Sequence, residues 1–296
     1  MLDRIFVTMS DAGYFLGLRA LMNSVYIYYG RSIPVVVMDV GLTKDQVDEI
    51  TKHPTFGGII PCKLCETREQ AWQIKQSCFV FSSEIARIVC WIDSDSVLTD
   101  RIDEAFEAAE QGYVVVPRWV EKDEALLIDP SGATTGEIVF SEKWAQYGKS
   151  LVGKKIDWFV SSIVCLDVSA SWDLVAAWAF TSKFALYARA DSPLPFVGLG
   201  DEAHLVGCVA ALGKEVLYLS GAEWADAHFN GPFFINKKTS DGKLFVQGRR
   251  GKQQKVLHDI AGFKWWQRPM NECFRPPVGQ KWEIFEHFLN FSTTGR

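Results

Sequence analysis

The chain has 296 residues, of which 48% are hydrophobic and 13% aromatic, a composition that excludes an intrinsically disordered protein. A net charge of −5 argues against a surface built to bind nucleic acid. The length fits one large domain or two fused lobes.

The cysteines and the first residues bear on location. Seven cysteines, an odd number without a secretory signal, favour free thiols in a reducing compartment. No uncharged apolar segment reaches about 18 residues, so we expect no membrane span. The sequence therefore predicts a cytoplasmic protein, with peripheral attachment to a membrane surface left open.

The first hundred residues alternate between strand and helix patterns. Strands are expected over 4–8, 34–39, 59–60 and 88–92. Helices are expected over about 10–29, from residue 43 onward, and over 66–83. Thr43 and Gln46 match a capping box that opens the second helix. Strands that alternate with helices are typical of a parallel sheet with right-handed crossovers. We therefore expect an α/β fold.

The pattern continues through the second half of the chain. Helices are expected over 102–111, 171–187 and 200–213, strands over 113–117, 158–167 and 215–219, and a loop-rich insertion over 130–155. A last aromatic helix over 282–291 either packs on the domain or mediates association.

Two carboxylates follow the clearest buried strand. Ile88–Ile92 is a continuous apolar run, and Asp93 and Asp95 come directly after it. Side chains two residues apart in an extended chain point the same way, so both carboxylates can hold one cation at the carboxyl edge of the sheet. The alternative is a turn in which Asp95 caps the next segment. No other Asp-x-Asp occurs in the chain, which favours the metal site.

The segment Ile92-Asp93-Ser94-Asp95 resembles the DxD motif of glycosyltransferases with the GT-A fold, which hold a nucleotide-sugar diphosphate through a divalent metal. The resemblance, to the glycogenin-like and galactosyltransferase-like families, implies a Rossmann-like, mixed and mostly parallel sheet flanked by helices. It also implies one catalytic domain over 1–270, with a nucleotide-binding half to about residue 100, an acceptor and donor-sugar half beyond it, and a tail over 271–296.

The resemblance assigns nucleotide contacts in the first half. Thr8 and Asp11 lie at the strand-to-helix turn that contacts the nucleoside, although helix capping is an equal alternative for Asp11. Ser94 joins the two aspartates at the diphosphate. Lys75 ends a segment that lies close to the nucleotide sugar in similar enzymes. A solvated helix face is its alternative, and we favour that slightly.

Two further segments resemble the donor-sugar and acceptor side. Ser161 and Ser162 stand in a strand where the similar enzymes carry an Asn-Ser-Gly pattern that lines the donor-sugar pocket. Asp201 and Glu202 begin a helix whose acidic start faces the sugars in those enzymes. Either carboxylate would accept the proton of the acceptor hydroxyl if the reaction inverts configuration. For Asp201, helix N-capping is an equal alternative.

A late cluster of His258, Gly262 and Lys264 resembles the HxxGxxKPW signature of the glycogenin-like families. There the histidine is the third metal ligand and the lysine meets the diphosphate. The spacing differs here, which leaves retaining or inverting stereochemistry open. His228 competes for the ligand role, and a structural role is the alternative for a lone histidine. An imidazole among oxygen ligands favours Mn²⁺ over Mg²⁺.

The segment over 236–255 is strongly basic. It carries seven Lys or Arg residues against one Asp, a net charge of +6. It is interpreted as a solvated loop, a flap that closes over the diphosphate, or a patch for an anionic acceptor or a membrane.

Together these features predict a metal-dependent glycosyltransferase, with hexose as the expected sugar. It would move the sugar from a nucleotide-diphosphate sugar, with UDP favoured, to a hydroxyl of a glycan or glycolipid, as in polysaccharide biosynthesis. A nucleotidyltransferase is one alternative, but the stretch over 8–13 lacks the glycine-rich loop of that class. A non-catalytic module that binds nucleotide sugars or carbohydrate is another.

Overall fold

The computed structural model describes residues 1–62, 73–118, 137–139, 145–153, 155–157, 159–187, 201–220, 224–226, 234–248, 253–258 and 281–293. The chain divides into two compact units. The first unit comprises Met1–Arg4, Cys62–Trp91 and Glu104–Ser220, and the second comprises Ile5–Pro61, Ile92–Asp103 and Gly221–Arg296. The chain passes between the units within the strands β1 (Leu2–Ser10) and β4 (Ala86–Ile92), so each unit is built from segments that are distant in sequence.

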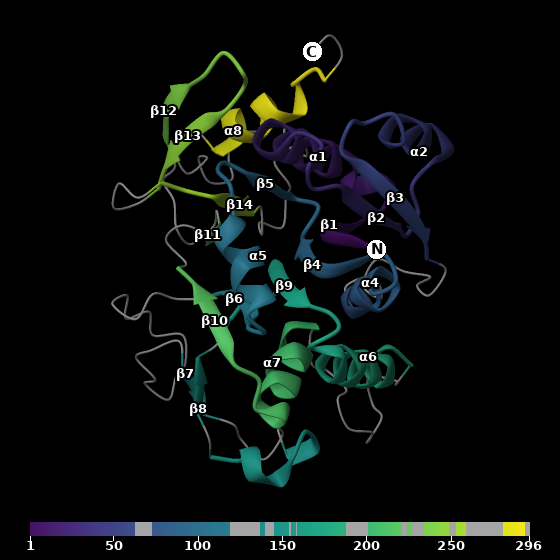
Figure 1. The fold of residues 1–296 in the computed structure, drawn as a ribbon, viewed down its shortest axis with the longest axis vertical. Helices are drawn as coiled ribbons and strands as arrows, with labels where there is room; N and C mark the ends of the chain where they lie inside the picture. Colours follow the sequence, from purple (N-terminus) through teal and green to yellow (C-terminus); the bar gives the residue numbers. More distant parts are fainter. Residues whose placement is uncertain are drawn as a thin grey trace, which may run out of the picture. The chain divides into compact units, whose positions relative to one another are not determined.

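The central sheet has seven strands in the order β10-β6-β9-β4-β1-β2-β3 (Figure 1). Of the pairs with a known register, β1–β2, β2–β3 and β10–β6 are parallel, whereas β6–β9 is antiparallel. The strands are β1 (Leu2–Ser10), β2 (Val35–Asp39), β3 (Phe56–Pro61), β4 (Ala86–Ile92), β6 (Val114–Pro117), β9 (Ile163–Asp167) and β10 (Val216–Leu219). This sheet confirms the predicted α/β class with a mixed, mostly parallel sheet.

The second unit begins with the predicted strand–helix alternation. A short 3-10 turn at Ala12–Tyr14 leads into α1 (Phe15–Tyr29), which ends at Gly30 with a φ of 60°, a conformation that favours glycine. The next helix, α2 (Lys44–Ile50), opens with the predicted capping box of Thr43 and Gln46. Local sequence signals therefore set these helix ends.

The rest of the second unit adds two small sheets and a helix. One sheet has the order β11-β14-β5 and the other is the hairpin of β12 and β13. The final helix, α8, packs on α1, where the Asn23 side-chain amide donates a 2.7 Å hydrogen bond to the Phe288 carbonyl. The elements are β5 (Ser96–Leu98), β11 (Trp224–Asp226), β12 (Phe234–Lys238), β13 (Leu244–Gln247), β14 (Val256–His258) and α8 (Lys281–Leu289).

The first unit carries four helices among its described residues, and in it α6 packs against both α4 and α7. They are α4 (Lys75–Ser82), α5 (Asp103–Glu110), α6 (Trp172–Tyr187) and α7 (Asp201–Leu212). A 3-10 turn at Lys149–Leu151 and an antiparallel pair of β7 (Glu137–Val139) and β8 (Lys155–Asp157) lie within or at the edge of the region predicted to be loop-rich.

One strand starts later than predicted. The sequence pattern placed it over 158–167, but β9 begins at Ile163, and Ser161 and Ser162 lie in a bend before it. The physical reason is that the Ser161 N–H donates to the Glu202 carboxylate at 3.2 Å, so it does not serve a strand ladder. The described part of the predicted helix over 66–83 begins at Lys75, and 63–72 lie outside the described residues.

Two further expectations concern cysteines and membrane spans. The cysteines that the structure describes all carry free thiols, as predicted. None of the described helices combines the length and the apolar character needed to cross a membrane.

Candidate functional site

The first candidate site lies in the second unit, where a turn follows the end of β4. The Asp93 carbonyl accepts a 3.0 Å hydrogen bond from the Ser96 N–H, and β5 begins at Ser96. The side chains of Asp93 and Asp95 are 21% and 8% exposed, and Ser94 is buried. The turn that the alternative interpretation expected is therefore present, and it holds two carboxylates close to the core.

Strand pairing brings a histidine to these carboxylates. His258 is the last residue of β14 and lies opposite Ser96 in the antiparallel pair of β14 and β5. Its Nε2 lies 3.4 Å from Asp93 Oδ2 and 3.3 Å from Asp95 Oδ1. One possible ligand atom from each of the three residues lies within 4.8 Å of the other two. The structure therefore brings together the three residues that the resemblance predicts as metal ligands.

This group of side chains fits a divalent cation. Two carboxylates at short range repel each other unless positive charge lies between them. Carboxylate oxygen with imidazole nitrogen is a donor set that suits Mn²⁺ and related cations. Three residues that were predicted to act nearby lie outside the described residues. They are Gly262, Lys264 and His228.

Thr8 and Asp11 also belong to the second unit. The Thr8 side chain is 1% exposed, and its hydroxyl oxygen has no hydrogen-bond partner within the part of the chain that is described. Asp11 caps the 3-10 turn, since its carboxylate accepts a 2.9 Å hydrogen bond from the Tyr14 N–H. The capping role is thus present, and the nucleoside contact stays a prediction.

The second candidate site lies in the first unit, around Lys75. This side chain is buried at the start of α4, with Lys75 only 7% exposed. Its ammonium donates to both the carbonyl and the hydroxyl of Ser161 at 3.1 Å and lies 3.0 Å from Asp201 Oδ2. It also lies 5.2 Å from the ring centroid of Trp91. The favoured expectation of a solvated helix face was therefore wrong.

Asp201 and Glu202 are the first two residues of α7. Asp201 accepts a 2.9 Å hydrogen bond from the Ser161 hydroxyl, and its carbonyl accepts one of 3.3 Å from Trp178 Nε1. The Asp201 carboxylate therefore bonds to Lys75 and Ser161, and the N-cap alternative stays a prediction because the residues before Asp201 lie outside the described residues. Negative charge in the first turn is stabilised by the helix dipole.

The Lys75 cluster therefore consists of Lys75, Ser161, Asp201 and Glu202, with Trp91 and Trp178 at its edge. Neither tryptophan was predicted, because their contacts join residues far apart in sequence and leave no local pattern. Ser162 is buried beside Ser161. The Lys75 ammonium is held in place by the Asp201 carboxylate and the Ser161 hydroxyl. Recognition of a sugar hydroxyl requires polar groups that are fixed in this way.

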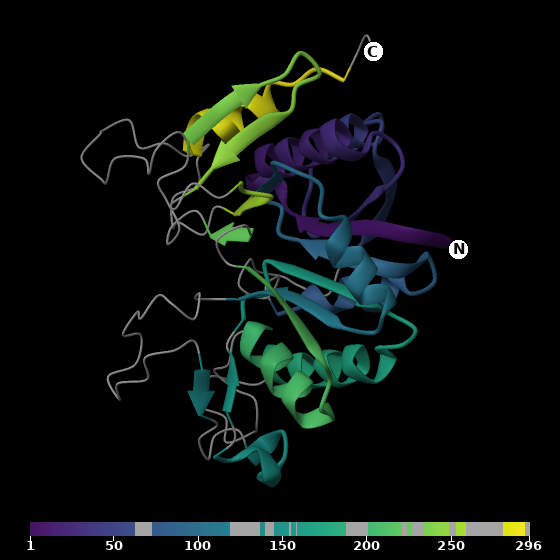
Figure 2. The ribbon, with the colours of Figure 1, turned by 60° about the vertical axis from the view of Figure 1, so that its left-hand side comes forward.

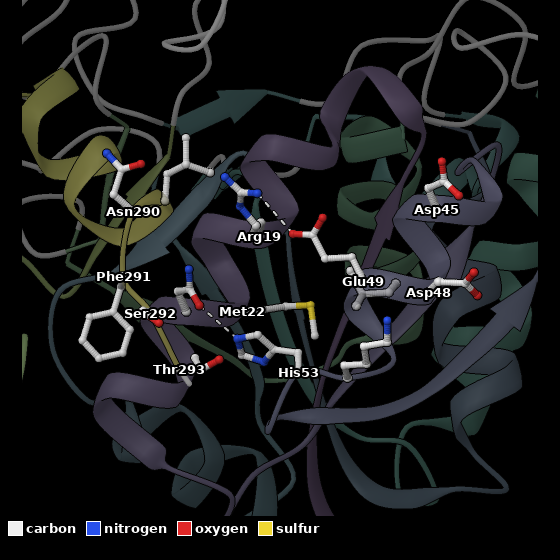
Figure 3. Close-up of a pocket in the computed structure, with 14 residues that line it drawn as sticks. Arg19, Met22, Asp45, Asp48, Glu49, His53, Asn290, Phe291, Ser292 and Thr293 are labelled. Atoms are coloured by element: carbon white, nitrogen blue, oxygen red, sulfur yellow. Dashed lines mark hydrogen bonds and ion pairs between the residues drawn. The ribbon is translucent and has the colours of Figure 1, made fainter. Parts of the chain in front are cut away.

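A groove of about 730 Å³ lies elsewhere in the second unit, between α1, α2 and the chain that follows α8 (Figure 3). Arg19 and Glu49 form an ion pair of 3.1 Å in it. His53 Nδ1 accepts from the Thr55 N–H at 3.2 Å, so the other ring nitrogen donates to Asn23 Oδ1 at 3.0 Å. None of the predicted site residues lines this groove.

We expect the protein to lose stability below neutral pH through two histidines, the buried His204 and the half-buried His53. Burial lowers the pKa of both His53 and His204 from 6.5 to about 4. The unfolded chain therefore binds more protons than the folded chain between these values, so the free energy of unfolding falls as pH drops below 6.5. Each histidine should cost about 2 kcal/mol by about pH 5.

The measurement is the urea midpoint as a function of pH for the parent chain and His53→Gln. The variant should show a flatter fall between pH 6.5 and 4, because the contribution of His53 is removed while that of His204 remains. If the urea midpoint of the variant falls with pH as steeply as that of the parent, His53 is protonated in the folded chain over this pH range.

The comparisons with known proteins come from structure alone, since the sequence matches no family model and no curated protein. The bifunctional glycosyltransferase WbbM superimposes with a TM-score of 0.57 at 14% identity, over 99% of this chain and 50% of that one. The apo form of the glycosyltransferase GlyE of Streptococcus pneumoniae TIGR4 gives 0.54 at 14% identity, over 98% of this chain and 61% of that one.

A third structure matches over nearly its whole length. The galactosyltransferase LgtC, in complex with donor and acceptor sugar analogues, gives a TM-score of 0.54 at 12% identity and covers 99% of this chain and 97% of that one. The chain spans only half of WbbM and 61% of GlyE. At these identities the likeness concerns the fold, and it confirms the predicted class: the chain has the GT-A-type fold found in these glycosyltransferases.

Proposed function

We propose that the chain is a metal-dependent glycosyltransferase that moves a hexose from a nucleotide-diphosphate sugar to a hydroxyl group of a glycan or glycolipid. The observation that carries this proposal is the convergence of Asp93, Asp95 and His258 within 4.8 Å in a fold shared with glycosyltransferases. The LgtC structure holds donor and acceptor sugar analogues. We infer the same two ligand classes here, with UDP as the nucleotide.

The chemistry follows from where charge develops. Breaking the bond between sugar and phosphate adds negative charge to the departing diphosphate and leaves positive charge on the anomeric carbon. Asp93, Asp95 and His258 would hold Mn²⁺ or Mg²⁺, which when bound supplies positive charge to the leaving group. These residues fix the position of that charge in advance, so little reorganisation is needed as the bond breaks.

The Lys75 cluster is assigned to the sugars. Lys75 and Ser161 hold Asp201 in place, and Glu202 accepts the Ser161 N–H. In a reaction that inverts configuration, Asp201 or Glu202 accepts the proton of the acceptor hydroxyl, because each is a carboxylate fixed at the start of α7. The two clusters lie in different units, and each assignment rests on its own contacts.

The test is thermal unfolding of the chain with UDP, GDP, CDP or ADP, each with Mn²⁺ and each with EDTA. We expect UDP to stabilise only when Mn²⁺ is present, because the diphosphate binds through the cation. A ligand at about 100 times its dissociation constant adds roughly 2.7 kcal/mol to the free energy of unfolding.

Turnover is measured separately on the folded chain, with Mn²⁺ or with EDTA, as UDP released from UDP-hexoses. Stabilisation by a nucleotide without metal-dependent release of UDP would favour the binding-module alternative. If no nucleotide stabilises the chain, or if EDTA makes no difference, the proposed function is wrong.

A further inference from the structure

The hairpin of β12 and β13 has two chemically different faces. Its register pairs Phe234 with Gln247 and Lys237 with Phe245, and residues that lie opposite each other share a face. We call these four residues the outer face. The opposite, inner face includes Leu244, which is 1% exposed.

The inner face fixes the hairpin on two helices of the second unit. The Tyr28 hydroxyl of α1 donates to the Leu244 carbonyl at 2.9 Å and accepts from the Leu244 N–H at 3.1 Å. His287 of α8 donates to the Gly242 carbonyl at 2.7 Å. Figure 2 shows the hairpin alongside α8. Over 234–248 the structure thus shows a docked hairpin and not a solvated loop.

The turn of the hairpin is tightly seated. Gly242 has a φ of +91°, and a Cβ added there would lie 2.5 Å from the Phe291 ring. Both the backbone conformation and the close ring therefore require glycine. The turn also carries an ion pair of 3.1 Å between Lys243 and Asp241. A hairpin held in this way presents its outer face as a fixed surface.

The outer face combines exposed aromatic rings with a cation. Phe234 is 49% exposed and Phe245 is 42% exposed. The Lys237 ammonium lies 5.8 Å from the centroid of the Phe245 ring. Exposed aromatic rings beside lysine are typical of surfaces at the boundary of a bilayer, where the rings enter the headgroup region and the ammonium meets phosphate.

Charge also favours an anionic partner. The hairpin carries three lysines against one aspartate, a net charge of +2, and the segment over 236–255 that it leads into carries +6, whereas the whole chain carries −5. A stable protein interface needs about 800 Å² on each partner, which is more than two rings and one lysine provide. Binding to a bilayer scales with the apolar area that enters it and with attraction to anionic lipid, so a small surface binds weakly and reversibly.

We propose that the outer face of the β12–β13 hairpin binds anionic phospholipid bilayers. Phe234 and Phe245 insert at the headgroup level, and Lys237 binds lipid phosphate. This inference goes beyond the proposed function and does not depend on it, since lipid binding needs neither donor nor metal. It gives the second unit a defined orientation at a membrane surface.

The test is co-sedimentation of the full chain with vesicles of phosphatidylcholine, alone or mixed with phosphatidylglycerol. The parent chain should bind the mixed vesicles, and raised ionic strength should weaken binding by screening Lys237. The double variant Phe234→Ser/Phe245→Ser should lower the partition coefficient at least roughly ten-fold. Lys237→Gln should lower it roughly five-fold.

The matched control is Phe81→Ser, which removes a phenylalanine of 44% exposure from α4. It should leave vesicle binding unchanged. Unfolding temperatures of all variants show whether the fold is retained, and Lys237→Gln changes only an exposed side chain. No binding to either vesicle, equal binding to both, or an equal loss in Phe81→Ser would each overturn the proposal.

Discussion

Replacing Asp95 by asparagine is expected to lower sugar transfer on the order of 10²-fold or more, as for other preorganised charged groups. Asparagine has nearly the same size, so the change removes charge and leaves packing. The Asp95 side chain is 8% exposed and lies 3.3 Å from His258 Nε2. Under the proposed function, loss of that carboxylate would weaken the binding of the cation that supplies positive charge to the leaving group.

A stability measurement separates this effect from misfolding. In EDTA, Asp95→Asn should unfold within about 1 kcal/mol of the parent, because one of two repelling carboxylates has been removed. The stabilisation by Mn²⁺ with UDP should be lost. The matched control is Asp48→Asn, which affects an exposed i,i+4 pair with Lys44 and should change neither transfer nor metal binding. Full transfer by Asp95→Asn would contradict the assignment.

The sequence alone could predict features that depend on neighbours in the chain. The cap of α2 depends on Thr43 and Gln46, three residues apart, and the end of α1 depends on Gly30. Likewise, Asp93 and Asp95 follow a strand whose apolar run reflects burial on both faces. These signals lie within a few residues of the structure they specify.

His258 is a different case. It meets Asp95 through the pairing of β14 with β5, across more than a hundred and fifty residues of sequence. Neither periodicity nor spacing reports that pairing. Its place beside the carboxylates was expected only from the resemblance to a known signature, and the geometry agrees with that expectation.

Lys75 shows what local patterns miss. A lysine on a helix is usually solvated, and the residues around Lys75 contain nothing that signals burial. Its partners, Ser161 and Asp201, lie far along the chain and are brought to it by the packing of the first unit. The same long-range contacts explain why β9 starts at Ile163, since the Ser161 N–H is used by Glu202.

Replacing Lys75 by methionine is expected to lower the free energy of unfolding by about 3 kcal/mol or more, because it leaves a largely buried carboxylate without its cation. The Lys75 and Asp201 side chains are 9% and 19% exposed. Asp201→Leu alone should cost a similar amount, since it strands the ammonium. The double variant Lys75→Met/Asp201→Leu should cost less than the sum of the two by about 2 kcal/mol.

The matched control is the ion pair of Arg19 and Glu49, which has a similar length of 3.1 Å but side chains that are 35% and 48% exposed. Arg19→Met should cost at most about 1 kcal/mol, because water compensates an exposed charge. Urea unfolding of the single and double variants provides the cycle. A cost of Lys75→Met no larger than that of Arg19→Met would show that the Lys75 pair is solvated.

Activity then separates a structural role of the Lys75 cluster from a role in sugar binding. A stable double variant that still transfers sugar would make the cluster purely structural, whereas a stable but inactive one supports its assignment to the sugars.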